Sequence, residues 1–174
     1  MVAPSRLAHF VFRTNRLDAM VRWYCTLLEA RVAYADEGIS FITYDDEHHR
    51  VAFVALDTYA EKPPGLQVGF YHAAFAFRDL GELLGNYQRL KSEGIVPWRS
   101  INHGPTVSFY YRDPDGNDIE MQVDSFPDAA ATNAWMRSEA FARNPIGINF
   151  DAEQMIAQRA RGVPDAVLMR RPDS

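Results

Sequence analysis

The stretch F-Y-H-A-A-F-A-F-R, from Phe70 to Arg78, is similar to an earlier stretch of the same chain. This internal similarity is the main evidence for the fold. At an offset of about 63 residues, L-A-H-F-V-F-R, from Leu7 to Arg13, has a histidine and a phenylalanine in matching places. The identities continue as the pairs His9 and His72, Phe12 and Phe75, Leu17 and Leu80, Tyr24 and Tyr87, and Leu27 and Leu90. A weak repeat at constant spacing indicates a duplicated structural module.

In both copies the sequence predicts a strand followed by a helix. The aromatic and apolar stretch predicts a strand, and the next segment has apolar residues at helical spacing. The helical positions are Leu17, Met20, Val21, Tyr24, Leu27 and Leu28 in the first copy, and Leu80, Leu83, Leu84, Tyr87 and Leu90 in the second. The second helix opens with Asp79 and Glu82 in capping-box spacing and is expected to end at Gly94.

Three strand-like runs follow each helix. They are R-V-A-Y, I-S-F-I-T-Y and R-V-A-F-V-A-L in the first copy, and V-P-W-R, T-V-S-F-Y-Y and D-I-E-M-Q-V in the second. We therefore expect an α+β fold in which two paired βαβββ modules, residues 1–60 and 61–127, form a cupped, mostly antiparallel sheet. The linker E-K-P-P-G, from Glu61 to Gly65, separates the modules. Residues 128–174 predict a C-terminal helical extension, and the whole is expected to be one structural domain.

Composition excludes several classes of protein. The net charge of −5 and pI near 5.5 argue against binding to nucleic acid, because only Arg170 and Arg171 are locally basic. The single Cys25 excludes a disulfide framework and fits a reducing compartment. No stretch approaches the roughly 18 apolar residues of a membrane helix. We expect a cytoplasmic protein with no membrane or nucleic-acid partner, and a homo-oligomer because the paired modules are small.

The hairpin from Ser108 to Asp124 contains an unusual carboxylate. If its turn is Asp113 to Asn117, the strand pairing puts Tyr110 opposite Glu120 on one face. A carboxylate in a half-apolar strand must face water or hold a positive charge, because burying it unpaired costs several kcal/mol. Asp118 and Gln122 share its face, so a solvated edge strand is an open alternative.

The two matched histidines suggest what the carboxylate holds. Pairing of the modules is expected to bring the two first strands together, so that His9 and His72 face each other. With Glu120 they would form the two-histidine, one-carboxylate triad of non-haem iron enzymes. A single histidine in an apolar strand is more often a hydrogen-bonded core residue. The repetition of the histidine at the same place in both copies favours the metal interpretation.

Over about residues 6–124, these features resemble the vicinal oxygen chelate superfamily, which includes glyoxalase I, fosfomycin and bleomycin resistance proteins and type I extradiol dioxygenases. The nearest likeness is to single-domain extradiol dioxygenases of the biphenyl-diol type. The run H-H-R-V-A-F, from His48, is similar to that family's paired-histidine stretch, and H-G-P-T-V-S-F-Y, from His103, to its segment with an active-site histidine and tyrosine. The spacing from His49 to His72 is longer than in two-domain members, and the spacing around His103 differs slightly.

The resemblance implies a role for each matched residue. It implies the metal ligands His9, His72 and Glu120 and the catalytic residues His49, Tyr110 and His103. His49 is expected to act as acid and base, with its neighbour His48 left open as an alternative. Tyr110 is expected to hydrogen-bond a substrate oxygen.

The resemblance further implies Fe(II), with Mn(II) as an alternative, a catechol-type diol and O2, and cleavage of the ring beside one hydroxyl-bearing carbon. Two other functions stay open. One is a glyoxalase-type lyase, isomerase or epimerase that uses its metal as a Lewis acid, although the last strand of the first module offers no fourth ligand. The other is a metal-free resistance or binding protein. The sequence does not name the diol.

Overall fold

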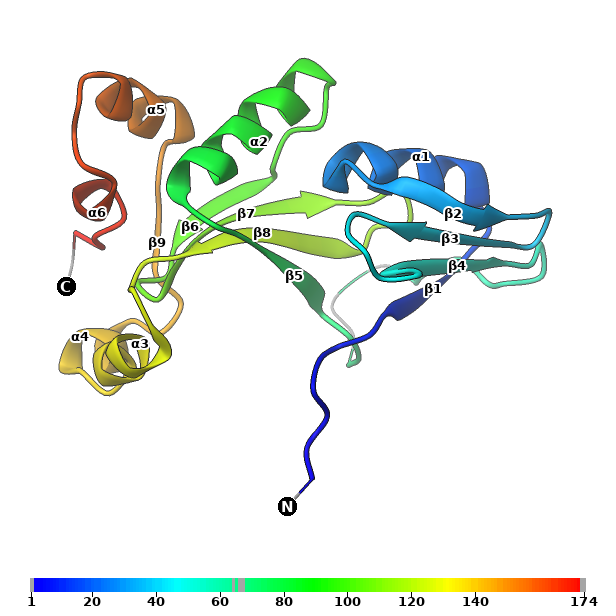
Figure 1. Cartoon of the computed structure of the whole chain (residues 1–174), viewed down its shortest axis with the longest axis horizontal. Helices are drawn as coiled ribbons and strands as arrows, with labels where there is room; N and C mark the ends of the chain where they lie inside the picture. Colours follow the sequence, from blue (N-terminus) through cyan, green and yellow to red (C-terminus); the bar gives the residue numbers. More distant parts are fainter. Residues whose placement is uncertain (1, 64, 66–67, 173–174) are drawn as a thin grey trace. The chain divides into compact units, whose positions relative to one another are not determined.

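The computed structural model describes residues 2–63, 65 and 68–172. Its contacts divide the chain into two compact units (Figure 1). The first unit comprises residues 1–70 together with 113–117, and the second comprises 71–112 and 118–174. The hairpin turn at 113–117 therefore belongs by its contacts to the first unit, although the strands that it joins belong to the second.

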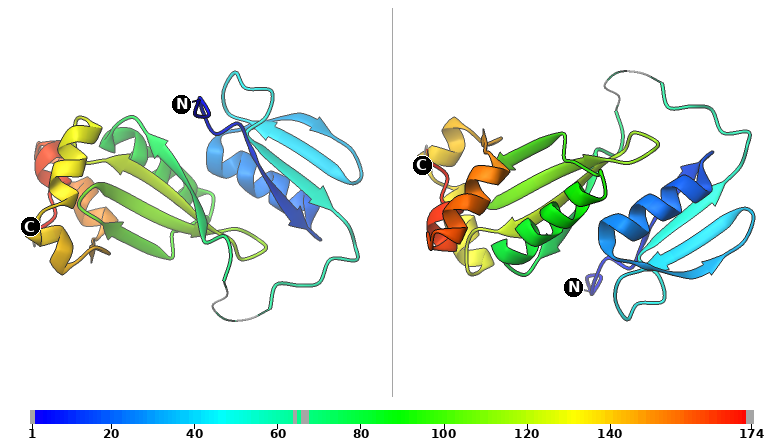
Figure 2. Two further views of the ribbon diagram at one scale, coloured as in Figure 1. Left: turned by 90° about the horizontal axis from the view of Figure 1, so that it is seen from below. Right: turned by 90° about the horizontal axis from the view of Figure 1, so that it is seen from above.

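The first unit is a four-stranded sheet covered by one helix. Its elements are β1 (Phe10–Thr14), α1 (Leu17–Leu28), β2 (Arg31–Ala35), β3 (Ile39–Thr43) and β4 (Val51–Ala55). The strand order is β1-β4-β3-β2, with β1 parallel to β4 and the other pairs antiparallel. Helix α1 lies across one face of the sheet (Figure 2) and buries Tyr24 against Phe12 and Phe53, with ring centroids 5.3 and 5.2 Å away. The apolar spacing along 17–28 thus produced the predicted core-facing helix.

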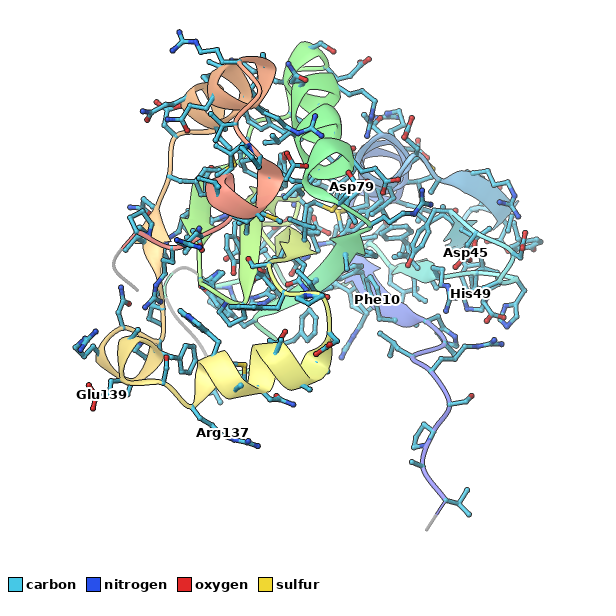
Figure 3. The ribbon with its side chains drawn as sticks, turned by 60° about the vertical axis from the view of Figure 1, so that its left-hand side comes forward. Phe10, Asp45, His49, Asp79, Arg137 and Glu139 are labelled. Carbon is cyan, nitrogen blue, oxygen red and sulfur yellow. The ribbon has the colours of Figure 1, made fainter. Side chains whose placement is uncertain are left out.

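The second unit repeats this arrangement. Its elements are β5 (His72–Phe77), α2 (Leu80–Ser92), β6 (Arg99–Asn102), β7 (Thr106–Arg112) and β8 (Asp118–Asp124). Strand β5 is parallel to β8, and β7 is antiparallel to both β6 and β8. Asp79 caps α2 by accepting a hydrogen bond from the Glu82 backbone N–H at 2.9 Å, at the helix end labelled in Figure 3. Asp79 is thus the helix cap that the spacing predicts, while the Glu82 carboxylate accepts from the Arg78 N–H at 3.0 Å and not from that of Asp79.

One strand of the second unit begins later than expected. The run V-P-W-R, residues 96–99, was expected to be a strand, but β6 begins only at Arg99. Pro97 has no backbone N–H to donate to a ladder, which explains why regular pairing starts beyond it. The Trp98 N–H already donates to the Tyr110 carbonyl at 2.9 Å.

The C-terminal extension belongs to the second unit. It contains α3 (Ala129–Met136), α4 (Glu139–Arg143), β9 (Ile148–Asn149), α5 (Ala152–Ala160) and α6 (Asp165–Leu168). The short strand β9, which the sequence did not indicate, pairs with β6 and completes the order β5-β8-β7-β6-β9. The Glu153 carboxylate accepts from the Tyr87 hydroxyl at 2.8 Å, which ties α5 to α2.

The predicted fold class is confirmed: the chain is an α+β protein with two βαβββ modules and a helical extension. Each module builds its own sheet. Their pairing into one cup stays a prediction. Within the described ranges, no helix is long and apolar enough to cross a membrane.

Candidate functional site

The β7–β8 hairpin has the predicted register. Tyr110 lies opposite Glu120, and Glu120 lies beside Ala74 of β5. The Asp113 N–H donates to the Asn117 carbonyl at 3.0 Å and closes the turn. The Asp113 side chain accepts two further backbone N–H groups of the same turn, which fixes the register of both strands.

The second sheet has one apolar face and one polar face. Ile119, Met121 and Phe109 are fully buried on the apolar side. Because side chains alternate along a strand, Glu120 and Tyr110 point to the opposite face, which His72 shares through its pairing with Asp118.

Glu120 is buried on this polar face, with only 5% of its surface exposed. Its Oε2 lies 3.0 Å from His72 Nε2, and its Oε1 lies 3.9 Å from His103 Nε2. The carboxylate therefore has an imidazole partner at hydrogen-bond distance in His72, which meets the need of a buried carboxylate for a partner. The alternative of a solvated charge on an edge strand is wrong.

His103 is oriented through both ring nitrogens. Its Nδ1 contacts the Ile146 carbonyl, which can only accept, so Nδ1 carries a proton. In the neutral ring Nε2 then has the free lone pair, and it lies 2.8 Å from the Tyr110 hydroxyl, which can donate to it or to Glu120. Burial lowers the pKa of His103, which favours this neutral form. Burial and the Glu120 carboxylate raise the pKa of Tyr110, so the hydroxyl keeps its proton.

The His72–Glu120 pair has a separation that suits a metal centre. Two ligand atoms at right angles, each about 2.1 Å from a first-row cation, lie about 3.0 Å apart. The 3.0 Å between His72 Nε2 and Glu120 Oε2 is the distance of a hydrogen-bonded pair and equally that of two such ligands, and imidazole with carboxylate is a donor set that ferrous iron accepts. His72 Nδ1 is buried with no hydrogen-bond partner in the described part of the chain.

The complete metal triad is not established by the structure. Among residues 2–63, 65 and 68–172, no group of three His, Cys, Asp or Glu side chains is arranged to hold a metal ion. The second unit brings together His72 and Glu120, whereas His9 belongs to the first unit. The role of all three as ligands stays a prediction.

The first unit gathers the remaining predicted residues. His9, which directly precedes β1, has its ring centroid 4.3 Å from that of His49. His49, labelled in Figure 3, stacks on Phe41 with centroids 4.7 Å apart, and burial lowers its pKa. His48 lies beside it but its side chain is 68% exposed. His49 is thus the more enclosed of the two, and its role as acid and base stays a prediction.

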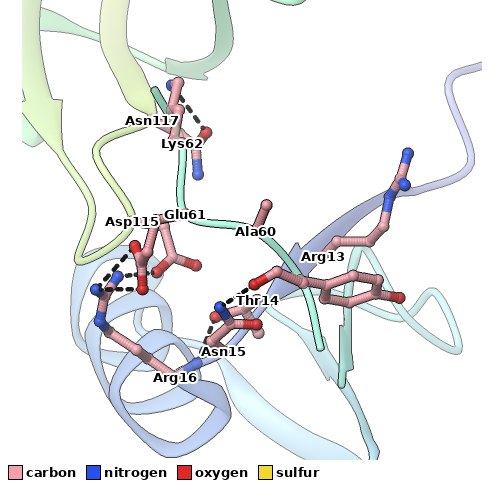
Figure 4. Close-up of a pocket in the computed structure, with 10 residues that line it drawn as sticks. Arg13, Thr14, Asn15, Arg16, Ala60, Glu61, Lys62, Asp115 and Asn117 are labelled. Atoms are coloured by element: carbon pink, nitrogen blue, oxygen red, sulfur yellow. Dashed lines mark hydrogen bonds and ion pairs between the residues drawn. The ribbon is translucent and has the colours of Figure 1, made fainter. Parts of the chain in front are cut away.

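A separate cavity of about 210 Å³ lies in the first unit (Figure 4). Its lining residues are Arg13, Thr14, Asn15, Arg16, Tyr59, Ala60, Glu61, Lys62, Asp115 and Asn117. Arg16 pairs there with Asp115 at 2.7 Å and with Glu61 at 3.0 Å. The described lining includes none of the predicted site residues, and its charges hold the hairpin turn to the linker.

Sequence reasoning missed the groups that hold His103. The Ile146 carbonyl belongs to the backbone, and every residue type has such an acceptor, so the sequence does not indicate this contact. Arg171, in the basic pair near the C-terminus, donates to the His103 carbonyl at 3.1 Å. The pair was noticed in the sequence only for its charge.

Comparisons with known proteins agree with this architecture. The chain is 44% identical to biphenyl-2,3-diol 1,2-dioxygenase 2 of Rhodococcus globerulus over 94% of this chain and 86% of the relative. It is 39% identical to biphenyl-2,3-diol 1,2-dioxygenase 3 of the same organism over 98% of this chain and 90% of the relative.

A solved structure shares the fold. The lactoylglutathione lyase of Agrobacterium tumefaciens matches with a TM-score of 0.56 and 20% identity, over 69% of this chain and 94% of that protein. The model of the Glyoxalase/Bleomycin resistance protein/Dioxygenase superfamily matches residues 6–121, which include both modules up to β8. The chain belongs to the Glyoxalase/Bleomycin resistance protein/Dioxygenase superfamily.

Proposed function

We propose that the protein is an Fe(II)-dependent extradiol dioxygenase that cleaves the ring of a catechol-type substrate with O2. The observation that carries the proposal is the cluster on the polar face of the second sheet in which the half-buried His72 and His103 surround the buried Glu120 and Tyr110. The 44% identity to a biphenyl-2,3-diol 1,2-dioxygenase over nearly the whole chain supports the same reaction class.

His72 and Glu120, joined by His9, would hold the metal. When bound, ferrous iron supplies a charge that favours the ionised diol and a redox-active centre for O2. Two imidazoles and one carboxylate occupy three positions and leave the others for substrate.

Tyr110 and His103 can take up the proton that the diol loses. The substrate O–H donates to the Tyr110 oxygen while the Tyr110 hydroxyl proton passes to His103 Nε2, 2.8 Å away. One O–H bond of the substrate breaks, one N–H bond forms on His103, and Tyr110 is neutral before and after. The lowered pKa of His103 keeps its ring neutral and available as an acceptor, and the raised pKa of Tyr110 keeps the hydroxyl protonated until the transfer.

The register of the first unit disfavours a glyoxalase-type reaction. Ala74 lies beside Glu120 in the second unit, and Val11, its counterpart in the repeat, lies beside Ala52 in the first. The first unit therefore has a methyl group at the position that corresponds to Glu120. A site with four protein ligands would lack its second carboxylate.

An oxygen-uptake assay tests the proposal. Protein loaded anaerobically with Fe(II), Mn(II) or Zn(II) is mixed with a panel of substituted catechols, and O2 consumption and the yellow ring-fission product are measured together. We expect both signals with Fe(II) or Mn(II) and neither with Zn(II). Product formation without O2, or bound iron with no turnover of any catechol but turnover of a hemithioacetal, would replace the proposal with the lyase function.

A further inference from the structure

We propose that Arg171 is a positioning residue that fixes the orientation of the His103 ring. The C-terminal extension, which contains Arg171, would then be required for the site to work. The kinetic consequence rests on the proposed function, whereas the structural claim about the His103 ring does not. Arg171 acts through backbone carbonyls: it donates to those of His103, Asn144 and Ala140.

Arg171 is almost completely buried, with 2% of its surface exposed. Its Nη1 donates to the carbonyls of His103 at 3.1 Å and Asn144 at 2.7 Å, and its Nη2 donates to the Ala140 carbonyl at 2.9 Å. Its guanidinium also lies 4.8 Å from the ring centre of Trp135. A planar guanidinium with several donors in fixed directions can join the loop after β6 to the end of α4 in this way.

The Asn144 contact reaches the His103 ring through a short loop. The Asn144 side chain accepts from the Gly147 N–H at 2.9 Å and donates to the Gly147 carbonyl at 3.1 Å. Between these residues lies Ile146, whose carbonyl accepts from His103 Nδ1. Arg171 thus holds the backbone of His103 with the same nitrogen that anchors the loop facing the His103 ring.

The fit between this loop and β6 is close. Gly147 has φ of +100°, and a Cβ there would lie 2.3 Å from the Asn102 carbonyl oxygen. Only glycine permits this approach. The Asn102 side chain in turn donates to the Met169 carbonyl at 2.9 Å, which draws the C-terminal segment against the end of β6. The contacts around His103 therefore leave little freedom for the loop while Arg171 is in place.

The arrangement determines which nitrogen of His103 accepts a proton. With the Ile146 carbonyl fixed, Nδ1–H is the donor and Nε2 is free for Tyr110. Without Arg171 the carbonyls of His103 and Asn144 lose their shared donor, so the ring and the Ile146 carbonyl are held less rigidly against each other and the ring can rotate or take the other tautomer. In that tautomer Nε2 carries the proton and cannot accept one from Tyr110.

The test compares Arg171→Met, Arg171→Lys and the matched control Arg170→Met in the full chain. Arg170 is the adjacent arginine and is exposed. The first readout is the tautomer of His103, observed by long-range ¹H–¹⁵N NMR of the metal-free protein and assigned with His103→Gln. The second is the pair kcat and KM of the iron-loaded protein, with iron content and thermal melting measured alongside.

We expect the wild-type chain and Arg170→Met to show His103 protonated on Nδ1. Arg171→Met is expected to mix the two tautomers and to lower kcat roughly 10- to 100-fold, with KM and iron content within about twofold. Arg171→Lys is expected to recover part of the loss, because an ammonium keeps the charge but not the planar set of donors.

Three results would overturn the inference: a folded Arg171→Met variant with the wild-type His103 tautomer, an equal change in Arg170→Met, or a loss that appears only in KM. If Arg171→Met does not fold, Asn144→Ala tests the same contact, because it loosens the Gly147 loop and leaves the Arg171 side chain intact. An unchanged tautomer in that variant counts against the inference. If the wild-type protein cleaves no diol, the proposed function fails while the NMR comparison still decides the role of Arg171.

Discussion

The two modules share a scaffold and differ at the positions that would do chemistry. In the second unit Tyr110 lies opposite Glu120. In the first unit the corresponding pair is Phe41 opposite Ala52. The first strand of each sheet starts at a histidine or directly after one: β5 starts at His72, and β1 follows His9. The second unit has oxygen atoms where the first has carbon.

The difference shows that the fold and the chemistry are carried by different residues. The buried leucines and tyrosines of the repeat build both helix–sheet cores, so these positions are matched between the units. His72 lies against a carboxylate, whereas His9 lies in a cluster of imidazole rings beside Phe41. A duplicated scaffold can therefore keep two histidines and confine the acidic ligand and the hydroxyl to one copy.

The largest expected effect comes from removing the charge of Glu120. Glu120→Gln keeps the shape of the side chain but removes the anionic ligand, so we expect loss of bound iron and a fall in ring cleavage of at least about 1,000-fold. Elemental analysis and O2 uptake measure the two losses. The matched control is Asp124→Asn, at the exposed end of the same strand, which should keep iron and activity. Retention of full iron by Glu120→Gln would contradict the ligand assignment.

The next effect concerns the Tyr110 hydroxyl, which has no counterpart at Phe41 in the first unit. Tyr110→Phe leaves His103 Nε2 without its donor and should lower kcat roughly 10- to 100-fold while iron stays bound. Stopped-flow measurement of product formation, with iron content in parallel, checks this. Loss of the metal together with activity would show that Tyr110 acts on the metal site and not on proton transfer.

A smaller effect compares the two tyrosines matched by the repeat. The Tyr24 hydroxyl is buried and donates to Asp113 Oδ2 at 3.0 Å, whereas the Tyr87 hydroxyl donates to Glu153, whose side chain is largely solvated. Tyr24→Phe should lower the free energy of unfolding by about 1–2 kcal/mol, because it removes a partner from a buried carboxylate. Tyr87→Phe should cost clearly less. Urea unfolding of both variants measures the difference, and equal losses would remove this distinction between the units.

The smallest expected effect comes from adding a hydroxyl to the first unit, which tests whether that unit can take over the role of Tyr110. Phe41→Tyr adds a hydroxyl at the position that corresponds to Tyr110, but Ala52 provides no carboxylate opposite it. We expect kcat within about twofold of wild type, since the proton transfer depends on the His103 and Tyr110 pair. The double variant Phe41→Tyr with Tyr110→Phe should remain as slow as Tyr110→Phe alone. Rescue in the double variant would show that the two units are interchangeable in this step.

Much of the fold was predictable because it depends on periodicity. The repeat gave the order of elements in both modules, and the turn from Asp113 to Asn117 fixed the pairing of Tyr110 with Glu120, which is confirmed. Side-chain chemistry at a turn or helix cap is local, so a single sequence contains it.

The features that the sequence did not predict depend on contacts between distant parts of the chain. Strand β9 has only two residues, Ile148–Asn149, and is a strand only because β6 lies beside it. The contacts of His103 with Ile146 and Arg171 join residues 43 and 68 positions apart through backbone carbonyls. Neither sequence spacing nor residue type specifies such contacts, so the positioning of the histidine had to be read from the structure.

The placement of the turn at residues 113–117 in the first unit has a consequence for synthesis of the chain. Tyr24 and Arg16 both bind carboxylates of that turn, at Asp113 and Asp115. A nascent chain that has emerged only as far as the linker has the whole first sheet but not these partners. The first unit therefore lacks these two contacts until the hairpin turn has been synthesised, and its folding is completed only after that turn has emerged.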